Sequence, residues 1–123
     1  MSALCLASGV IAARIAIAGF TLAWMHSIEK IRWEEDWRIE GAELVLVEGR
    51  IRGSGAGMEP PPDARLVDGV WHFPGKIRLT ALHLAHSPFV TGYELCIDGH
   101  CSPLAERLPG LAEIATIHAT PCS

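Results

Sequence analysis

The chain has 123 residues, half of them hydrophobic, and 14 acidic against 10 basic residues give it a net charge of −4 at pH 7. This length is enough for one hydrophobic core, so we expect residues 1–123 to form a single domain. The acidic balance argues against a nucleic-acid binder, which needs a surplus of Lys and Arg on one face.

The mean hydropathy of +0.27 is high for a chain of this kind. It predicts that part of the apolar surface is covered, either by a partner or by a second copy of the chain in a homodimer.

Two apolar runs open the chain, residues 1–13 and 15–25, and Arg14 separates them. Neither run approaches the roughly 20 residues that span a bilayer, so we expect no transmembrane segment. A secretory signal requires a basic residue before its apolar run, and none precedes the first run here. This absence favours a cytoplasmic location. The two runs are therefore predicted to be core strands.

Charged and apolar residues alternate from Lys30 to Glu40, in the stretch "KIRWEEDWRIE". The even positions are all charged, whereas the odd positions are Ile or Trp except for Glu35. This alternation predicts a strand with one buried face and one solvated face, on which ion pairs contribute a few tenths of a kcal/mol each. Glu35 shares the apolar face, where a lone carboxylate needs donors, a cavity or a proton.

The preceding strand repeats this feature, because His26 shares a face with Phe20, Leu22 and Trp24. A turn near residues 29–30 would bring His26 and Glu35 within a diagonal of one another on the inner face. Two interpretations stay open: a core histidine that hydrogen-bonds a neighbour, or a ligand-binding or catalytic group.

The segment "RGSGAGMEPPPDA", residues 52–64, combines glycines with three prolines. It is not a phosphate-binding loop, because no Lys-Ser or Lys-Thr follows and the prolines prevent a helix directly after it. It is either a long connection between sheets or a loop whose small residues let a ligand approach the backbone.

Four X-Gly dipeptides separate strand-like runs: Ser8-Gly9, Glu40-Gly41, Asp68-Gly69 and Asp98-Gly99. Glycine readily adopts the positive φ of a two-residue hairpin turn, and aspartate tolerates it. We therefore predict an all-β fold, an antiparallel meander of about nine or ten short strands that closes as a barrel or stacks as a sandwich. The only helical turn expected is at residues 103–108. Further strands are expected at residues 3–7, 10–17, 20–28, 77–85 and 113–120.

The cysteines are predicted to form two disulfides. Across the turn at Asp98-Gly99, Cys96 faces Cys101 in a pair whose Cα atoms are close enough for a bond. Cys5 and Cys122 then pair the first strand with the last. We expect no metal site, because the cysteine spacings and the scattered histidines do not match a zinc motif. Disulfides favour a periplasmic location, whereas the missing export signal favours a cytoplasmic one.

The segments "FTLAWMHSIEKIRWEEDW", "RIRGSGAGMEPPPDARLVDGVWH", "LAHSPF" and "YELCIDGHCSPL" resemble a small bacterial family of unknown function. That family is often encoded beside the permeases of TRAP-type transporters of the TAXI class. The resemblance runs from Leu4 to Cys122, and its most specific marks are His26, Ser27 and Glu29 together with residues 55–58. It implies a role near solute uptake and a periplasmic location, and it implies no catalytic activity.

We expect a non-enzymatic accessory or binding domain, without a cofactor, that contacts a small anionic solute or a TRAP transporter component. Its candidate ligand-binding residues are His26, Ser27, Glu29, Glu35, Ser54, Gly55, Ala56, Gly57 and Met58. The alternative is a small hydrolase or isomerase in which His26 is the general base, Glu35 orients it, and backbone amides of the glycine-rich loop stabilise an oxyanion.

Overall fold

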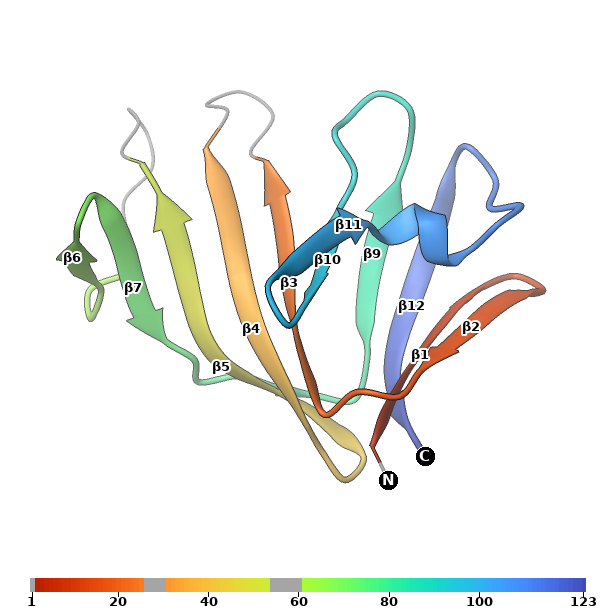
Figure 1. Ribbon diagram of the computed structural model, residues 1–123, viewed down its shortest axis with the longest axis horizontal. Coiled ribbons are helices and arrows are strands. Elements are labelled where there is room, and N and C mark those ends of the chain that lie inside the picture. Colours follow the sequence, from red (N-terminus) through yellow and green to blue (C-terminus); the bar gives the residue numbers. More distant parts are fainter. Residues whose placement is uncertain (1, 26–30, 54–60) are drawn as a thin grey trace.

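The computed structural model describes residues 2–25, 31–53 and 61–123, and almost all of its regular structure is β-strand (Figure 1). The strands form two antiparallel sheets, which confirms the predicted all-β class. The described residues contain twelve strands, more than the nine or ten predicted.

The large sheet has the strand order β11-β10-β3-β4-β5-β7-β6, and β8 also pairs with β5. Its longest strands are neighbours, β4 (Arg32–Glu40) and β5 (Glu43–Arg52). The other members are β3 (Gly19–Met25), β6 (Arg65–Val67), β7 (Val70–Pro74), β8 (Arg78–Leu79), β10 (Glu94–Ile97) and β11 (His100–Pro103).

The small sheet has the strand order β2-β1-β12-β9. Its strands are β1 (Ala3–Ser8), β2 (Ile11–Ile15), β9 (Leu82–His86) and β12 (Ala115–Cys122). A short 3-10 helix, η1 (Leu104–Arg107), stands where a helical turn is expected. Within the described ranges, no helix is long and apolar enough to cross a membrane.

The predicted hairpin turns are present, with a difference in two of them. Asp68 and Asp98 have φ values of 50° and 51°, each followed by a glycine with positive φ, so both Asp-Gly pairs form the turn itself. In the first hairpin, Ser8 pairs with Ile11, so the turn residues are Gly9-Val10. In the hairpin after β4 they are Gly41-Ala42. Both turns are shifted by one residue, because glycine takes the first of the two central positions.

The meander is only partly realised, because five pairings join strands that are not consecutive in the sequence. β1 pairs with β12, β3 with β10, β9 with β12, and β5 with both β7 and β8. The segment 77–85, expected as one strand, divides into β8 in the large sheet and β9 in the small one. Local periodicity does not encode these long-range choices.

The sheets face each other across a common core, so the architecture is a sandwich. Fully buried aliphatic side chains come from both sheets and from η1, and each contributes about 1.5–3 kcal/mol. They are Leu4, Leu6, Leu22, Leu44, Leu95, Leu104, Leu108 and Ile117.

Both predicted disulfides are confirmed. Cys96 and Cys101 are directly opposite in the β10–β11 hairpin, with Cα atoms 3.9 Å apart. Cys5 and Cys122 join β1 to β12 across a sequence separation of 117 residues, with Cα atoms 6.0 Å apart. Among the described residues no cysteine is free.

Candidate functional site

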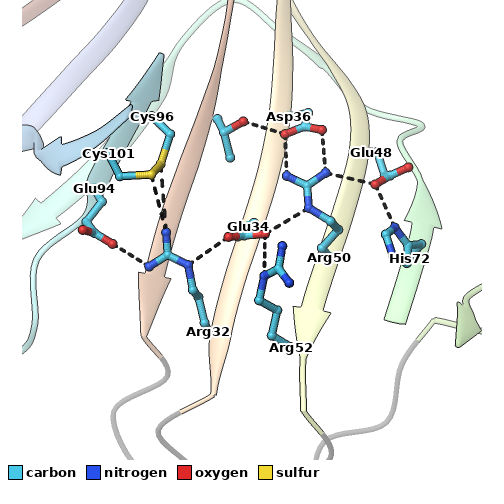
Figure 2. Close-up of polar contacts among 11 residues, drawn as sticks. Arg32, Glu34, Asp36, Glu48, Arg50, Arg52, His72, Glu94, Cys96 and Cys101 are labelled. Carbon is cyan, nitrogen blue, oxygen red and sulfur yellow. Dashed lines mark hydrogen bonds and ion pairs between the residues drawn. A yellow bond between two sulfur atoms is a disulfide. The ribbon is translucent and has the colours of Figure 1, made fainter. Parts of the chain in front are cut away.

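The outward side of the large sheet carries a network of charged side chains, which we call the charged face (Figure 2). Glu34 lies at its centre and is only 8% exposed. Its carboxylate accepts hydrogen bonds from the Nε atoms of Arg32, Arg50 and Arg52, at 2.9, 2.9 and 3.0 Å. The strand register produces this geometry, because Glu34 is directly opposite Arg50, and Arg32 is directly opposite Arg52.

Arg50 connects the centre of the charged face to one side of it. It donates to both carboxylate oxygens of Asp36, at 2.6 and 2.8 Å, and to Glu48 at 3.0 Å. Thr21 also donates to Asp36, and Glu48 contacts His72 Nδ1 at 3.0 Å. A guanidinium that grips one carboxylate with two bonds is rigidly oriented.

Arg32 connects the other side of the charged face to the disulfide hairpin. It donates to Glu94 at 2.5 Å, and its Nη2 lies 3.8 and 4.0 Å from the sulfurs of Cys101 and Cys96. Beneath it, Ala23 is completely buried, so the charged side chains form a closed layer over this part of the sheet.

These contacts shift the acid–base properties of the network. Burial alone would raise the pKa of Glu34, but the hydrogen bonds from Arg32 and Arg50 outweigh it and lower the pKa below its usual value. The hydrogen bond from Arg50 likewise lowers the pKa of Asp36, and that same bond raises the pKa of Arg50. All three groups therefore stay charged at neutral pH.

Arg52 is the least compensated cation of the network. Among the described residues, Arg50 contacts three carboxylates and Arg32 contacts two, whereas Arg52 contacts only Glu34, which the other two already share. The Arg52 side chain is 48% exposed. Among the described residues no partner occupies its two terminal nitrogens, Nη1 and Nη2.

A groove of about 870 Å³ runs over this region. Its floor is formed by Glu34, Asp36, Arg50 and Arg52, and its walls by residues 16–21 and by the tip of the β10–β11 hairpin at Asp98-Gly99. The chain segment 16–21 leads from the small sheet into β3, so the groove lies where the charged face meets this crossing.

Sequence periodicity places these charges on one strand face but does not predict their organisation. The expectation of a solvated surface with weak ion pairs is wrong for Glu34, because three arginines from two strands cover it. A detectable signal is the complementary pattern Glu48, Arg50, Arg52, which alternates on the next strand as Arg32, Glu34 and Asp36 do on β4.

Glu35 lies on the opposite face of β4, between Leu22 on β3 and Gly49 on β5. Trp37 Nε1 donates to its carboxylate at 3.2 Å. Burial raises the pKa of Glu35, and this hydrogen bond only partly opposes the shift. Burial also raises the pKa of Tyr93, as does the negative charge of Glu35.

Aromatic side chains gather on this inner face. Trp24 stacks on Trp33 with ring centroids 6.0 Å apart, and Tyr93 packs against Trp24 at 5.7 Å. The Trp33 indole nitrogen is buried and has no acceptor among the described residues. This region therefore holds the partly buried carboxyl of Glu35 and an indole donor that has no partner in the described ranges.

The remaining candidate residues, His26, Ser27, Glu29 and 54–58, lie outside the described residues, so the predicted contact between His26 and Glu35 stays a prediction. The segments that hold them are attached at the same end of the large sheet. Met25 is the last described residue before segment 26–30, and it pairs with Arg32. Arg32 in turn pairs with Arg52, which lies just before segment 54–60.

Two sequence predictions concern metals and cofactors. In ranges 2–25, 31–53 and 61–123, no group of three or more His, Cys, Asp or Glu side chains has the arrangement of a metal site.

Comparison with known proteins yields one match. The model of the family described as "Domain of unknown function (DUF1850)" matches residues 20–104, which include β4 to β11, all of β3 but its first residue, and therefore the whole charged face. No curated protein and no solved structure matches the chain.

Proposed function

We propose that this chain, which belongs to the DUF1850 family of unknown function, is a non-enzymatic module that binds a small anionic solute in the groove of the charged face. The observation that carries the proposal is Arg52, a half-exposed guanidinium that lines the groove. The one carboxylate that it contacts in ranges 2–25, 31–53 and 61–123 is shared with two other arginines.

The chemistry of Arg52 suits an anion. Its Nε is held by Glu34 at 3.0 Å, which orients the side chain and leaves the outer edge of the guanidinium toward the groove. That edge matches a carboxylate or phosphate with two parallel hydrogen bonds, and such charge-assisted pairs are stronger than neutral ones.

The other groups in the groove narrow the class of solute. Glu34, Asp36 and Asp98 also line it and repel a ligand that carries many negative charges. Their oxygens accept hydrogen bonds from hydroxyl or ammonium groups. The lining therefore favours a small solute with one anionic group and several donors, such as a hydroxy acid or an amino acid.

The network beneath the groove lowers the free-energy cost of binding. Association ordinarily loses about 0.5–1.5 kcal/mol for each flexible side chain that becomes ordered. Here Arg50 and Asp36 are already held by several contacts in the unliganded protein. Binding then orders mainly Arg52.

We place this activity beside TRAP-type solute uptake, outside the cytosol. The resemblance to proteins encoded next to TRAP permeases supports the setting, and the two disulfides support the compartment, because disulfides persist where conditions are oxidising.

A thermal-shift screen tests the proposal. Hydroxy acids, amino acids, dicarboxylates and inorganic phosphate are added to wild type, to Arg52→Gln and to the control Arg38→Gln, an exposed arginine on the same strand face as Glu34. We expect a solute that raises the melting temperature of wild type and of Arg38→Gln but not of Arg52→Gln. An unchanged shift in Arg52→Gln contradicts the proposal, and so does a panel without any hit.

The same screen tests the residues predicted from sequence. His26→Ala, Ser27→Ala, Glu29→Gln and a variant with Gly55 and Gly57 changed to Ala are compared with Arg52→Gln. A shift that is lost in His26→Ala but kept in Arg52→Gln would move the site to the inner face around Glu35.

The inner face supports a second candidate function, a small hydrolase or isomerase. The specific observation in its favour is Glu35, a carboxyl whose pKa is raised by burial and that lies among aromatic side chains, as is typical of groups that transfer protons. Turnover of an ester or an isomerisable acid that disappears in both His26→Ala and Glu35→Gln would support it.

A further inference from the structure

Two histidines meet on the outer face of the small sheet, away from the charged face. His83 on β9 is directly opposite His118 on β12, and both side chains are exposed. Their Nδ1 atoms are 2.9 Å apart, and the rings meet edge to face with centroids 4.7 Å apart. We propose that His83 and His118 form a binding site for a divalent transition metal, Cu²⁺ or Ni²⁺, with water in the remaining coordination positions.

The 2.9 Å between the two Nδ1 atoms is a hydrogen-bond distance, and it is also close to the spacing of neighbouring ligands in one class of metal geometry. Imidazole nitrogens bind such ions at about 2.0–2.1 Å, so two neighbouring ligands at right angles are about 2.8–3.0 Å apart, whereas tetrahedral ligands are about 3.3–3.4 Å apart. The observed 2.9 Å fits the right-angled arrangement. Square-planar or tetragonal coordination by nitrogen and oxygen is typical of Cu²⁺ and Ni²⁺ rather than of Zn²⁺.

In the metal-free protein the same contact is a hydrogen bond in which one neutral ring donates to the other. For a metal to bind, the donor ring moves its proton from Nδ1 to Nε2, so that both Nδ1 atoms present a lone pair. Both rings then turn until the two lone pairs converge on one point beside the line that joins the nitrogens.

The neighbours of the pair leave the site accessible. Ala7 on β1 lies opposite His118 on its other side, and Ala85 follows two residues after His83 on the same strand. Small side chains of this kind do not block the approach of an ion. β9 is also the last strand of its sheet, so the open coordination positions face solvent.

No cysteine thiolate competes with the pair in the described part of the chain. All four cysteines of the sequence are held in disulfides, so they present no thiolate. His100 is exposed at the hairpin tip and serves as a single-histidine control.

The test is a titration of the untagged protein with CuCl₂, NiCl₂ and ZnCl₂, followed by calorimetry and, for copper, by electron paramagnetic resonance. We expect one equivalent of Cu²⁺ per chain and a tetragonal spectrum with hyperfine coupling to two imidazole nitrogens. His83→Ala and His118→Ala should each weaken Cu²⁺ binding by at least about tenfold, because changes even to groups that support a ligand weaken metal affinity 10–100-fold. His100→Ala should bind as wild type does.

Several results would overturn the proposal. They are equal copper affinity in wild type and in either single variant, coupling to fewer than two nitrogens in the wild-type spectrum, or tighter binding of Zn²⁺ than of Cu²⁺. The number of coupled nitrogens is measured on the wild type alone, so this result tests the proposal even if one substitution disturbs folding. Metal-free melting temperatures of the variants show whether they fold, and we expect little change because both rings are exposed.

Discussion

Replacement of Glu34 by Gln should destabilise the protein strongly, although it removes only a charge. The substitution keeps the shape of the side chain but leaves Arg32, Arg50 and Arg52 facing one another around a neutral group. Removal of one partner from a buried ion pair costs about 3–5 kcal/mol. Because Arg52 is half-exposed and Arg32 is partly exposed, we expect a value at the lower end, about 3 kcal/mol.

Urea unfolding measures this loss. With a denaturant dependence of about 1.5–3 kcal/mol per molar urea, a loss of about 3 kcal/mol lowers the midpoint by about 1–2 M. The control is Glu40→Gln, on the same strand and face, whose carboxylate pairs with Arg38 and Arg78 in solvent and should leave the midpoint unchanged. Equal midpoints for the two variants would refute the idea that Glu34 holds the network together.

The pH dependence gives this prediction a second check. The pKa of Glu34 is lower in the folded protein than its ordinary value of 4.5, so its contribution is fully present above about pH 4.5 and is lost as the pH falls through the folded-state pKa. The difference in stability between wild type and Glu34→Gln should therefore shrink at acid pH. A difference that stays constant down to strongly acid pH would contradict the electrostatic explanation.

Glu35→Gln should change the stability in the opposite direction and make the protein more stable at neutral pH. Because the pKa of Glu35 is raised by burial, its ionised form destabilises the fold at neutral pH, so the variant should unfold at a higher midpoint at pH 7. This gain should disappear below about pH 4.5, where Glu35 is protonated in both the folded and the unfolded protein. A lower urea midpoint for the variant than for wild type at pH 7 would contradict this prediction. For the disulfides, loop-closure entropy predicts a loss of about 5 kcal/mol for Cys5→Ser with Cys122→Ser and about 2 kcal/mol for Cys96→Ser with Cys101→Ser, because the bonds close loops of 117 and 5 residues. Similar urea midpoints for the two double variants would contradict the entropic account.

The hairpin at Asp98-Gly99 shows how far local sequence determines structure. Its turn residues require positive φ, and once the turn is placed, the pairing of Cys96 with Cys101 follows by counting outward. The same reasoning yields the alternation of β4. Both results depend only on residues close together in the chain.

Long-range register explains what could not be predicted. The burial of Glu34 depends on a shift of one residue between β4 and β5 at Asp36 and Trp37, which sets which arginines stand opposite it. The contact between His83 and His118 depends on the pairing of β9 with β12, 35 residues apart. The bulge offsets the register that the Gly41-Ala42 turn sets between β4 and β5, and no turn joins β9 to β12, so no local pattern could have revealed these contacts.

The most direct test of the binding proposal is a nuclear magnetic resonance titration of the solute that gives the largest thermal shift. Our account predicts chemical-shift changes at the Arg52 side-chain Nε and at the backbone amides of Gly19 and Gly99, which line the groove. Changes confined to the indole signals of Trp24 and Trp33, on the opposite face of the sheet, would contradict it.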